Sequence, residues 1–389
     1  MESKDTISRD KLSRRAFIQR TSLAAMGSFA GALASNRAAG TTSNGVRTAR
    51  ILNYNPMMGY RRLGRTGLMI SEVSLGGHWK NRSGERYWDE FADEQVPSDV
   101  VKNRNEVIGA CIEAGINYLD IGTAAECLAY GVALKGRREK MIIGADDYKL
   151  CAREPERCTV EKLTFDIDSC LRRLRMDYLD IWRVKADMYG GSTDSHVETI
   201  IETFEKARQA GKVRYLGISS HRRAWLQHVI ETFAAVQVVS FPVTARTKEK
   251  GKAASKESVQ EVEAGYGADT EQSIFQSVRK HNVGLIAIKP FMGGNLFERK
   301  TRFPVPEPGD KQEHDIARLT LQCILTNEAI TATIPGLSSI HEVDNAVKAS
   351  CASRVTMGPA ERHWLKQMTE RRWAALPQRY AWLHNWEVV

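Results

Sequence analysis

The sequence predicts an α/β protein, a (β/α)8 TIM barrel preceded by a β-hairpin. After Met58, short apolar runs alternate with amphipathic helical stretches eight times. Such alternation favours a parallel sheet, and eight strand–helix units favour a closed barrel. An open doubly wound sheet, the competing architecture, would show a glycine-rich phosphate turn after an early strand, and the sequence contains no G-x-G-x-x-G.

The predicted elements follow in chain order. The hairpin comes first, at residues 59–63 and 68–70 around the turn 64–67. The strands are predicted at 73–77, 118–121, 141–145, 178–184, 213–218, 236–241, 284–288 and 331–334. The helices are predicted near 102–114, 126–135, 160–173, 197–210, 222–232, 270–281, 315–327 and 339–349. Two insertions, 80–98 and 243–267, fall on the side where βα loops build active sites.

The N-terminus carries the pattern of a twin-arginine export signal. Residues 13–18 read SRRAFI, and an uncharged, weakly apolar segment then ends in Ala-Leu-Ala before Ser35. This segment is too short and too rich in Gly, Ala and Ser for a stable membrane span. We expect a signal peptide at 1–34, a linker at 35–56 and the barrel at 57–389, with the twin-arginine translocase as a partner and a periplasmic or other extracytoplasmic location. The alternative is a basic disordered tail followed by a chance apolar helix.

Charge and cysteine content exclude other classes of function. The formal net charge is +9, but residues 1–34 hold six Lys/Arg against three Asp/Glu, and the rest is mildly basic without a basic stripe. Nucleic-acid binding is therefore not expected. The seven cysteines show no CxxC and no paired metal spacing, so no metal site is predicted. Cys151 and Cys158 could form a bridge or bind a metal; the favoured interpretation is two unpaired thiols.

The most informative stretch is 116–131, INYLDIGTAAECLAYG. It predicts a buried strand that ends in Asp120, a short loop of small residues, and a helix that begins near Glu126. An Asp at the C-terminal end of a barrel strand lies where such folds carry out chemistry.

Six segments spread over residues 58–350 resemble the aldo-keto reductases. They are 60–67 (YRRLGRTG), 115–120 (GINYLD), 177–181 (DYLDI), 211–219 (GKVRYLGIS), 290–296 (PFMGGNL) and 334–345 (IPGLSSIHEVDN). The resemblance implies a barrel plugged by its N-terminal hairpin and a nicotinamide-dependent oxidoreductase. In that family a Tyr follows the strand-end Asp by five residues, but here Ala125 stands at that position.

The other catalytic positions have changed as well. Active members of the family use a Tyr as proton donor, a Lys paired with an Asp to lower the pKa of that Tyr, and a His that orients the substrate. Asp120 keeps the Asp position, whereas the Lys position falls on Asp146 and the His position on Lys185. The standard mechanism therefore cannot be carried over.

A rebuilt site is the alternative that the residues offer. Arg183 and Lys185 share a strand face with Ile181, so we expect both to point to the barrel mouth. The catalytic candidates are Asp120, Asp146, Arg183 and Lys185, with Lys185 as proton donor or oxyanion stabiliser. The competing interpretation is a structural network in which these charges neutralise one another.

The resemblance also implies cofactor and substrate residues. For NADP(H) they are Ser219, Ser220, Lys289, Pro290, Gly293, Gly294, Gly336, Ser338 and Asn345. The last three resemble a segment where a helix N-terminus faces the adenosine phosphate. Ser220 replaces a usual Asn, Ser240 a usual Gln and Lys289 a usual Ser. The substrate candidates are His78, Trp79 and Tyr189, and Tyr189 is a better substitute for the missing phenol than Tyr130, which we expect to pack inside its helix.

The leading hypothesis is an exported NADP(H)-dependent oxidoreductase that acts on the carbonyl or alcohol of a small, polar, sugar-like substrate. Because free nicotinamide cofactor is not expected outside the cytoplasm, we expect a tightly held NADP(H). The chain lacks the C-terminal ferredoxin-like Cys cluster of some bacterial relatives, so no iron–sulfur cluster is expected. The second hypothesis is a non-redox barrel that binds carbohydrate or performs acid–base chemistry on it, and the third is a catalytically silent binding protein.

Overall fold

The structure is a computed structural model that describes residues 51–77, 96–147, 149–249, 272–297, 311–350 and 356–389, with the backbone alone at 311–314. All of them belong to one compact unit, Ala49–Val389. The predicted signal peptide, His78, Trp79 and most of both insertions lie outside the described residues.

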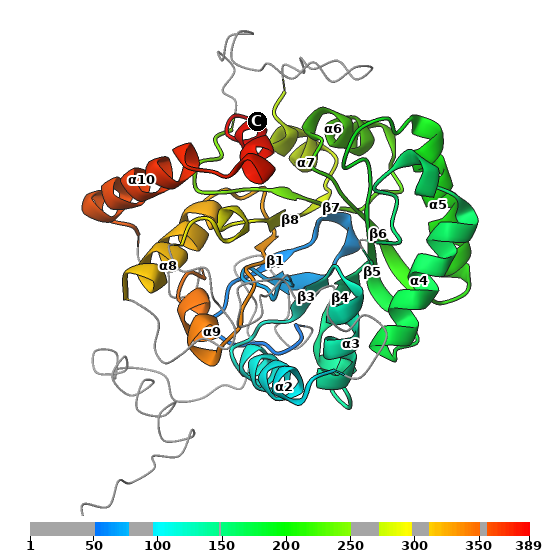
Figure 1. Ribbon diagram of the computed structural model, residues 1–389, viewed down its shortest axis with the longest axis horizontal. Helices are drawn as coiled ribbons and strands as arrows, with labels where there is room; N and C mark the ends of the chain where they lie inside the picture. Colours follow the sequence, from blue (N-terminus) through cyan, green and yellow to red (C-terminus); the bar gives the residue numbers. More distant parts are fainter. Residues whose placement is uncertain (1–50, 78–95, 148, 250–271, 298–310, 351–355) are drawn as a thin grey trace, which may run out of the picture. The chain divides into compact units, whose positions relative to one another are not determined.

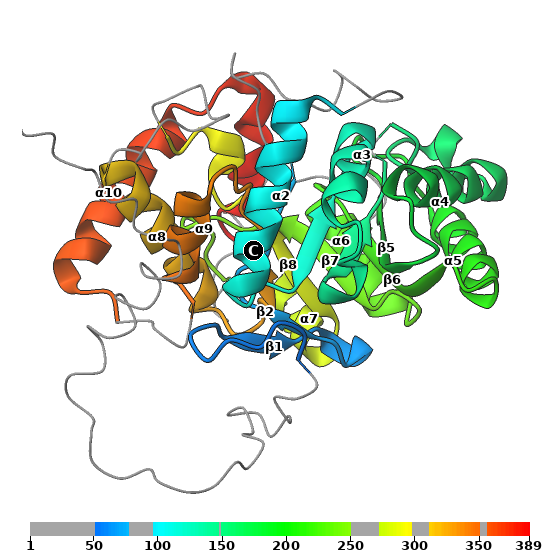
Figure 2. The ribbon, with the colours of Figure 1, turned by 90° about the horizontal axis from the view of Figure 1, so that it is seen from below.

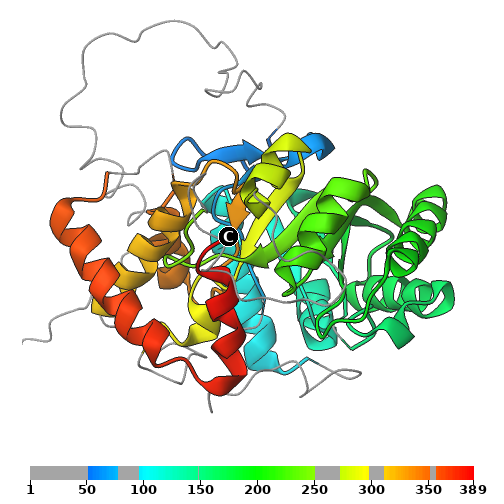
Figure 3. The same ribbon diagram turned by 90° about the horizontal axis from the view of Figure 1, so that it is seen from above.

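The predicted hairpin is present at one end of the barrel. Strands β1 (Tyr60–Arg62) and β2 (Met69–Ser71) pair antiparallel, and the short helix η2 (Gly64–Thr66) forms the turn between them. Leu63 packs so closely on Gly284, the first residue of a barrel strand, that a Cβ there would come within 2.5 Å of it. The hairpin thus closes the N-terminal end of the barrel, as Figures 2 and 3 show for the blue segment.

Seven parallel strands follow one another around the barrel in chain order. They are β3 (Tyr118–Ile121), β4 (Ile142–Ala145), β5 (Leu179–Lys185), β6 (Val213–Ser219), β7 (Val238–Pro242), β8 (Gly284–Ile288) and β9 (Ala332–Thr333). The predicted fold class is confirmed, and each of these strands lies within three residues of its predicted bounds.

Residues 73–76 occupy the eighth position, between β9 and β3. Val73 bridges to Thr333 of β9, and Leu75 bridges to Leu119 of β3, both in parallel orientation. The Asp120 N–H donates to the Leu75 carbonyl at 2.9 Å. The prediction of a continuous strand at 73–77 is wrong, because this segment pairs only at single residues, but the segment still joins the two ends of the sheet.

Helices surround these strands in sequence order (Figure 1). They are α2 (Ser98–Glu113), α3 (Ala124–Ala133), α4 (Val160–Leu174), α5 (Asp194–Gln209), α6 (Arg223–Thr232), α7 (Ile274–Lys280), α8 (Lys311–Leu325) and α9 (Ile340–Val347). Helix α3 begins at Ala124 instead of near Glu126, because the Thr123 hydroxyl caps it by accepting the Glu126 N–H. The chain continues into α10 (Pro359–Ala374), which contacts α8, and the 3-10 segment η9 (Gln378–Trp386).

The end of the predicted linker belongs to the folded unit. Ile51 is buried, and the Asn53 amide donates to the Lys140 carbonyl at 2.7 Å and the Ile116 carbonyl at 3.1 Å. Residues 51–55 therefore pack on the barrel, and a linker that takes no part in the fold ends before Ile51.

The barrel interior changes from apolar to polar along its axis. Leu63 and Ile70 of the hairpin region pack against Tyr118, Ile142 and Ile181 near the starts of the strands. Because side chains alternate across a strand, residues two and four positions further on share the same inner face. This places Asp120, Asp146, Arg183 and Lys185 above the apolar layer, towards the C-terminal mouth.

Candidate active site

Four buried charged side chains meet at the C-terminal ends of β3, β4 and β5. Arg183 donates from Nε to Asp120 Oδ1 at 2.6 Å, and its Nη2 lies 3.3 Å from Asp146 Oδ1. Lys185 Nζ lies 2.6 Å from the same Asp146 oxygen. The structure thus brings together all four catalytic candidates, which we call the charge cluster.

The two carboxylates of the charge cluster are held unequally. Asp146 contacts both cations through Oδ1 and accepts the backbone N–H of Lys185 through Oδ2 at 2.9 Å. Asp120 contacts only Arg183 among the two cations. Lys185 has a further acceptor in the Gly122 carbonyl, at 3.1 Å.

Burial and the neighbouring charges set the titration of these groups. Burial raises the pKa of Asp120 above its usual range, although Arg183 and the Tyr118 hydroxyl act in the opposite direction. Burial lowers the pKa of Arg183, but Asp120 and Asp146 together raise it above its ordinary value. Arg183 therefore stays charged and serves as a fixed cation, not as a proton donor.

A second pair of buried carboxyl groups, Asp147 and Asp166, lies between the barrel strands and α4. Asp147 pairs with Arg173 of α4 at 3.0 Å. Asp166 of α4 accepts the Asp147 N–H at 3.0 Å and the Trp182 indole N–H at 3.3 Å. Asp147 thus faces α4 and not the barrel interior, although it follows Asp146 directly.

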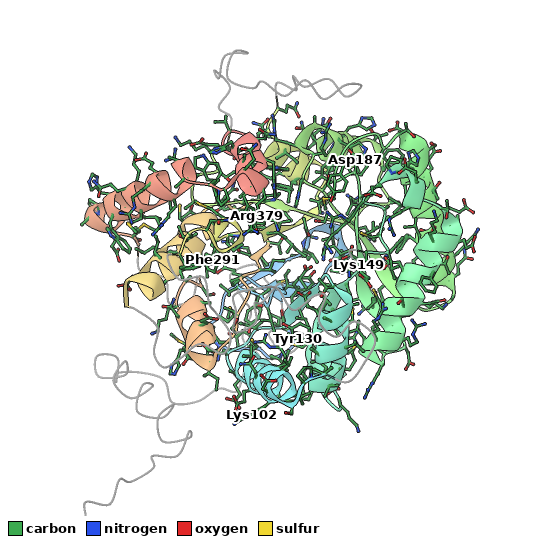
Figure 4. The ribbon with its side chains drawn as sticks, viewed as in Figure 1. Lys102, Tyr130, Lys149, Asp187, Phe291 and Arg379 are labelled. Carbon is green, nitrogen blue, oxygen red and sulfur yellow. The ribbon has the colours of Figure 1, made fainter. Side chains whose placement is uncertain are left out.

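The hydroxyl groups of three tyrosines have different surroundings, which decide whether any of them could act as the phenolic proton donor. Tyr189 is 64% exposed and its hydroxyl accepts a 2.6 Å hydrogen bond from Arg153 at the rim. Tyr130, labelled in Figure 4, is buried in α3, where its hydroxyl accepts a hydrogen bond from Arg104. Tyr118, which the sequence analysis did not select, donates to Asp120 Oδ1 at 2.9 Å. Its position two residues before Asp120 was the available signal, since this spacing puts both on one strand face.

Serine side chains continue the inner face across β6 and β7. Lys185, Ser219 and Ser240 stand in register on three adjacent strands, so they form one row at the mouth. The Ser240 hydroxyl is buried and has no hydrogen-bond partner within the described ranges. Ser220 lies beside this row and donates to the Asp187 carbonyl at the rim, at 3.3 Å (Asp187 is labelled in Figure 4).

The first residues after β8 contact the C-terminal segment. Lys289, Gly293 and Gly294 all have positive φ, and Pro290 is buried. A Cβ on Gly293 would come within 2.4 Å of the Tyr380 ring of η9, so this ring lies directly on the glycine. Figure 4 labels Phe291 and Arg379, one on each of these contacting segments.

Aromatic stacking fixes η9 over the end of β6. The Trp382 ring stacks on His221 with centroids 3.8 Å apart. Trp386 donates from its indole nitrogen to the His221 carbonyl at 3.1 Å and stacks on Phe241 of β7. His221, in the β6–α6 loop, is thus held against the C-terminal segment by both tryptophans.

The β9–α9 turn holds the remaining predicted cofactor residues. Gly336 bridges to Gly76, Ser338 is buried, and Asn345 lies half-buried on α9. The Ser338 N–H donates to the Glu342 carboxylate at 2.6 Å. A carboxylate of the chain itself therefore takes a backbone donor that the sequence analysis assigned to a phosphate.

Metal and disulfide chemistry have no support in the described part of the chain. No group of three His, Cys, Asp or Glu side chains there is arranged to hold a metal ion. Cys151 and Cys158 are buried thiols that do not form a disulfide bond, and burial raises the pKa of both.

Comparison with known proteins identifies the family. The profile described as "Aldo/keto reductase family" matches residues 100–356. The chain belongs to this family. It is 25% identical over 320 residues to an uncharacterized oxidoreductase, YqkF, of Bacillus subtilis, covering 76% of this chain and 92% of that protein. It is likewise 25% identical to the L-galactose dehydrogenase of Arabidopsis thaliana over 313 residues, covering 74% and 87%.

Two further matches agree with this assignment. A 6-dehydroglucose reductase of Novosphingobium aromaticivorans is 26% identical over 211 residues, covering 50% of this chain and 63% of that protein. The solved structure of aldo-keto reductase AKR11C1 from Bacillus halodurans superposes with a TM-score of 0.54 at 22% identity, covering 80% of this chain and 96% of that one. At this identity the structural match supports the fold alone.

The nicotinamide cofactor of the aldo/keto reductases fits one part of the mouth better than another. A buried hydroxyl without a partner is costly, and a ligand amide at the end of β7 would satisfy Ser240. At α9, by contrast, Glu342 already holds the Ser338 N–H. The chain therefore fits the nicotinamide end of the cofactor at β6 and β7 and offers less to a phosphate at α9.

Proposed function

We propose that this aldo/keto reductase family member is an oxidoreductase that interconverts a carbonyl and an alcohol on a small, polar, sugar-like substrate with NADP(H). The observation that carries the proposal is the position of Lys185, whose ammonium group stands at the mouth in register with Ser219 and Ser240. A cation beside a row of hydroxyl groups suits a hydroxylated ligand.

Lys185 supplies the electrophilic group of the proposed reaction. An ammonium group has three N–H donors, and two of them reach Asp146 Oδ1 and the Gly122 carbonyl. The described residues offer Nζ no third acceptor and the side chain is 11% exposed, so the third donor is left for an oxygen at the mouth. Such a donor stabilises negative charge that develops on a carbonyl oxygen during reduction.

The cofactor, when bound, supplies a hydride to the carbonyl carbon. Ser219 and Ser240 would hold its nicotinamide end, and the backbone of Gly293 and Gly294 would lie along its pyrophosphate. The family resemblance favours NADP(H), whereas the Glu342 carboxylate at Ser338 disfavours a further phosphate nearby. The preference for NADPH over NADH is therefore tested by measuring the binding of both cofactors.

Relatives in the family support the substrate class. The names L-galactose dehydrogenase and 6-dehydroglucose reductase both specify reactions on sugars. The charge cluster and the serine row give this chain a polar mouth, which suits a substrate with several hydroxyl groups.

Export by the twin-arginine route to a periplasmic or other extracytoplasmic location completes the proposal, with the cofactor held tightly through transport. It rests on Arg14, Arg15 and the small residues before Ser35. Among the described residues, no helix is both long and apolar enough to cross a bilayer. Replacing Arg14 and Arg15 together by Lys should retain the protein in the cytoplasm, whereas Arg20→Lys, outside the motif, should not; unchanged export of the double variant contradicts the route.

The alternative function is a non-redox barrel that binds carbohydrate or performs acid–base chemistry on it. Two contacts favour it: the Tyr380 ring lies on Gly293, and Glu342 occupies the Ser338 N–H. Both affect positions that resemble cofactor contacts in the family.

Cofactor binding separates the two functions. The chain has eight Trp residues, so NADPH or NADH added to the purified protein should quench tryptophan fluorescence to saturation. Free tryptophan at matched absorbance corrects for light absorbed by the cofactor. Saturable quenching at low micromolar concentration supports the oxidoreductase, and no quenching by either cofactor at high micromolar concentration contradicts it.

A further inference from the structure

One carboxyl oxygen in the charge cluster has no donor among the residues that the structure describes. Asp120 Oδ1 accepts two hydrogen bonds, from the Tyr118 hydroxyl at 2.9 Å and from Arg183 Nε at 2.6 Å. Within the described ranges no donor reaches Oδ2 of this residue. The Asp120 side chain is 8% exposed, so it reaches the surface of the mouth.

The orientation of the Asp120 carboxyl group is set by Tyr118, which lies deeper in the barrel. Tyr118 is fully buried in the apolar layer, and its hydroxyl fits because residue 144 is a glycine: a Cβ there would come within 2.2 Å of the phenol oxygen. The two oxygens of a carboxyl group point in different directions. Holding Oδ1 on Tyr118 and Arg183 therefore turns Oδ2 away from the apolar layer.

The two cations are shared unequally between the carboxyl groups of Asp120 and Asp146. Arg183 and Lys185 both contact Asp146. Asp120 contacts Arg183 but not Lys185. A carboxylate between two cations is stabilised in its charged form more than a carboxylate beside one. When neighbouring carboxyl groups have environments this different, the less stabilised one is the candidate acid.

We propose that Asp120 is the acid–base residue of this site and replaces the missing phenol, while Lys185 holds the substrate oxygen. This assignment rests on the proposed function. In reduction, the Oδ2–H bond of Asp120 breaks and its proton passes to the carbonyl oxygen as a hydride from the dihydronicotinamide forms the new C–H bond. The alcohol is released, Asp120 is left as a carboxylate beside Arg183, and a proton from water restores the acid.

The titration of Asp120 agrees with this role. Burial raises the pKa of Asp120, the direction that an acid needs in order to hold its proton closer to neutral pH. The charged or titratable groups that face it in the described structure are Arg183, Tyr118 and Lys185, with Asp146 beyond Arg183. Tyr118 and Arg183 are positioning residues in this account, since they act through Asp120.

Three variants test the assignment. Asp120→Asn keeps the shape but cannot release a carboxyl proton, and turnover should fall about 10²–10⁴-fold, with cofactor affinity within a few-fold of wild type. Asp147→Asn, a matched buried carboxyl group that faces α4, should keep the wild-type pH profile. Tyr118→Phe removes a hydrogen bond that lowers the pKa of Asp120, so the falling limb of the reduction rate should move to higher pH.

Failure of the assignment is distinct from failure of the proposed function. If Asp120→Asn binds cofactor and turns over within about threefold of wild type, Asp120 is not the acid, although the oxidoreductase function stands. If wild type binds no cofactor, the proposed function fails. Carbon-13 NMR of aspartate-labelled protein reads Asp120 without turnover: its resonance, identified by its loss in Asp120→Asn, should titrate above the usual Asp pKa, and titration at or below that value overturns the assignment.

Discussion

The two halves of the barrel mouth differ in the chemistry they present. The half on β3, β4 and β5 holds four buried charges bound to one another, whereas the half on β6 to β9 presents serine hydroxyls and glycine backbone under an aromatic C-terminal segment. The first half contains the four catalytic candidates, Asp120, Asp146, Arg183 and Lys185. In the second half, the Tyr380 ring lies on Gly293 and the Trp382 ring stacks on His221.

Because of this difference, we expect the two halves to contribute differently to stability and to ligand binding. In the half on β3, β4 and β5, which we call the charged half, each buried charge contacts another, so removing one leaves its neighbours with fewer partners. In the half on β6 to β9, which we call the serine half, the residues are small and few of them bond to one another. The charged half should therefore control both stability and chemistry, and the serine half should control ligand binding with little effect on stability.

The largest expected effect follows loss of Arg183. Arg183→Met leaves two buried carboxylates, Asp120 without a cation and Asp146 with only Lys185. The free energy of unfolding should fall by about 3–5 kcal/mol, measured by urea denaturation. Arg214→Met is the control, because Arg214 is half exposed and pairs with Asp180, which also contacts Arg138; its loss should cost about 1 kcal/mol or less. Equal effects of the two variants would contradict the contrast between buried and half-exposed charges.

A smaller effect concerns Asp166 of α4, which lies outside the barrel and accepts the Asp147 N–H. Burial and the charge of Asp146 raise the pKa of Asp166 to about 8. The native state then holds a proton that the unfolded chain has lost above its ordinary pKa of 3.8. Stability should fall as pH rises through this window, and Asp166→Asn should reduce that fall by about 2 kcal/mol or more between pH 5 and 8. Urea unfolding at both pH values measures it, and parallel pH dependence of the two proteins would contradict it.

The smallest stability effect is expected in the serine half. Ser240→Ala removes a buried hydroxyl that has no partner among the described residues, so the free energy of unfolding should change by less than about 1 kcal/mol or rise slightly. Cofactor affinity should nevertheless weaken if Ser240 binds the nicotinamide amide. Thr333→Val is the matched control, since its hydroxyl is also buried and has no partner in the described part of the chain. If both variants bind cofactor like wild type, Ser240 is not part of the site.

The sequence predicted the strands, the barrel and the meeting of the charge cluster for simple geometric reasons. Strand ends of a barrel converge at one mouth, and the two-residue spacing puts Arg183 and Lys185 on one face. It could not predict that both cations contact Asp146, because that depends on side-chain lengths across three strands. Nor could it predict Tyr380 on Gly293, a contact between segments far apart in the chain, or the exposure of Tyr189.

The central claim is that Lys185 stabilises the negative charge that develops on the substrate oxygen at the barrel mouth. Turnover of Lys185→Met, measured with cofactor saturating and its binding verified by fluorescence, tests it most directly. Lys212→Met, which removes a half-exposed partner of Asp168, is the control. We predict a loss of about 10²–10³-fold for Lys185→Met and little change for the control. Unchanged turnover by Lys185→Met would contradict the account.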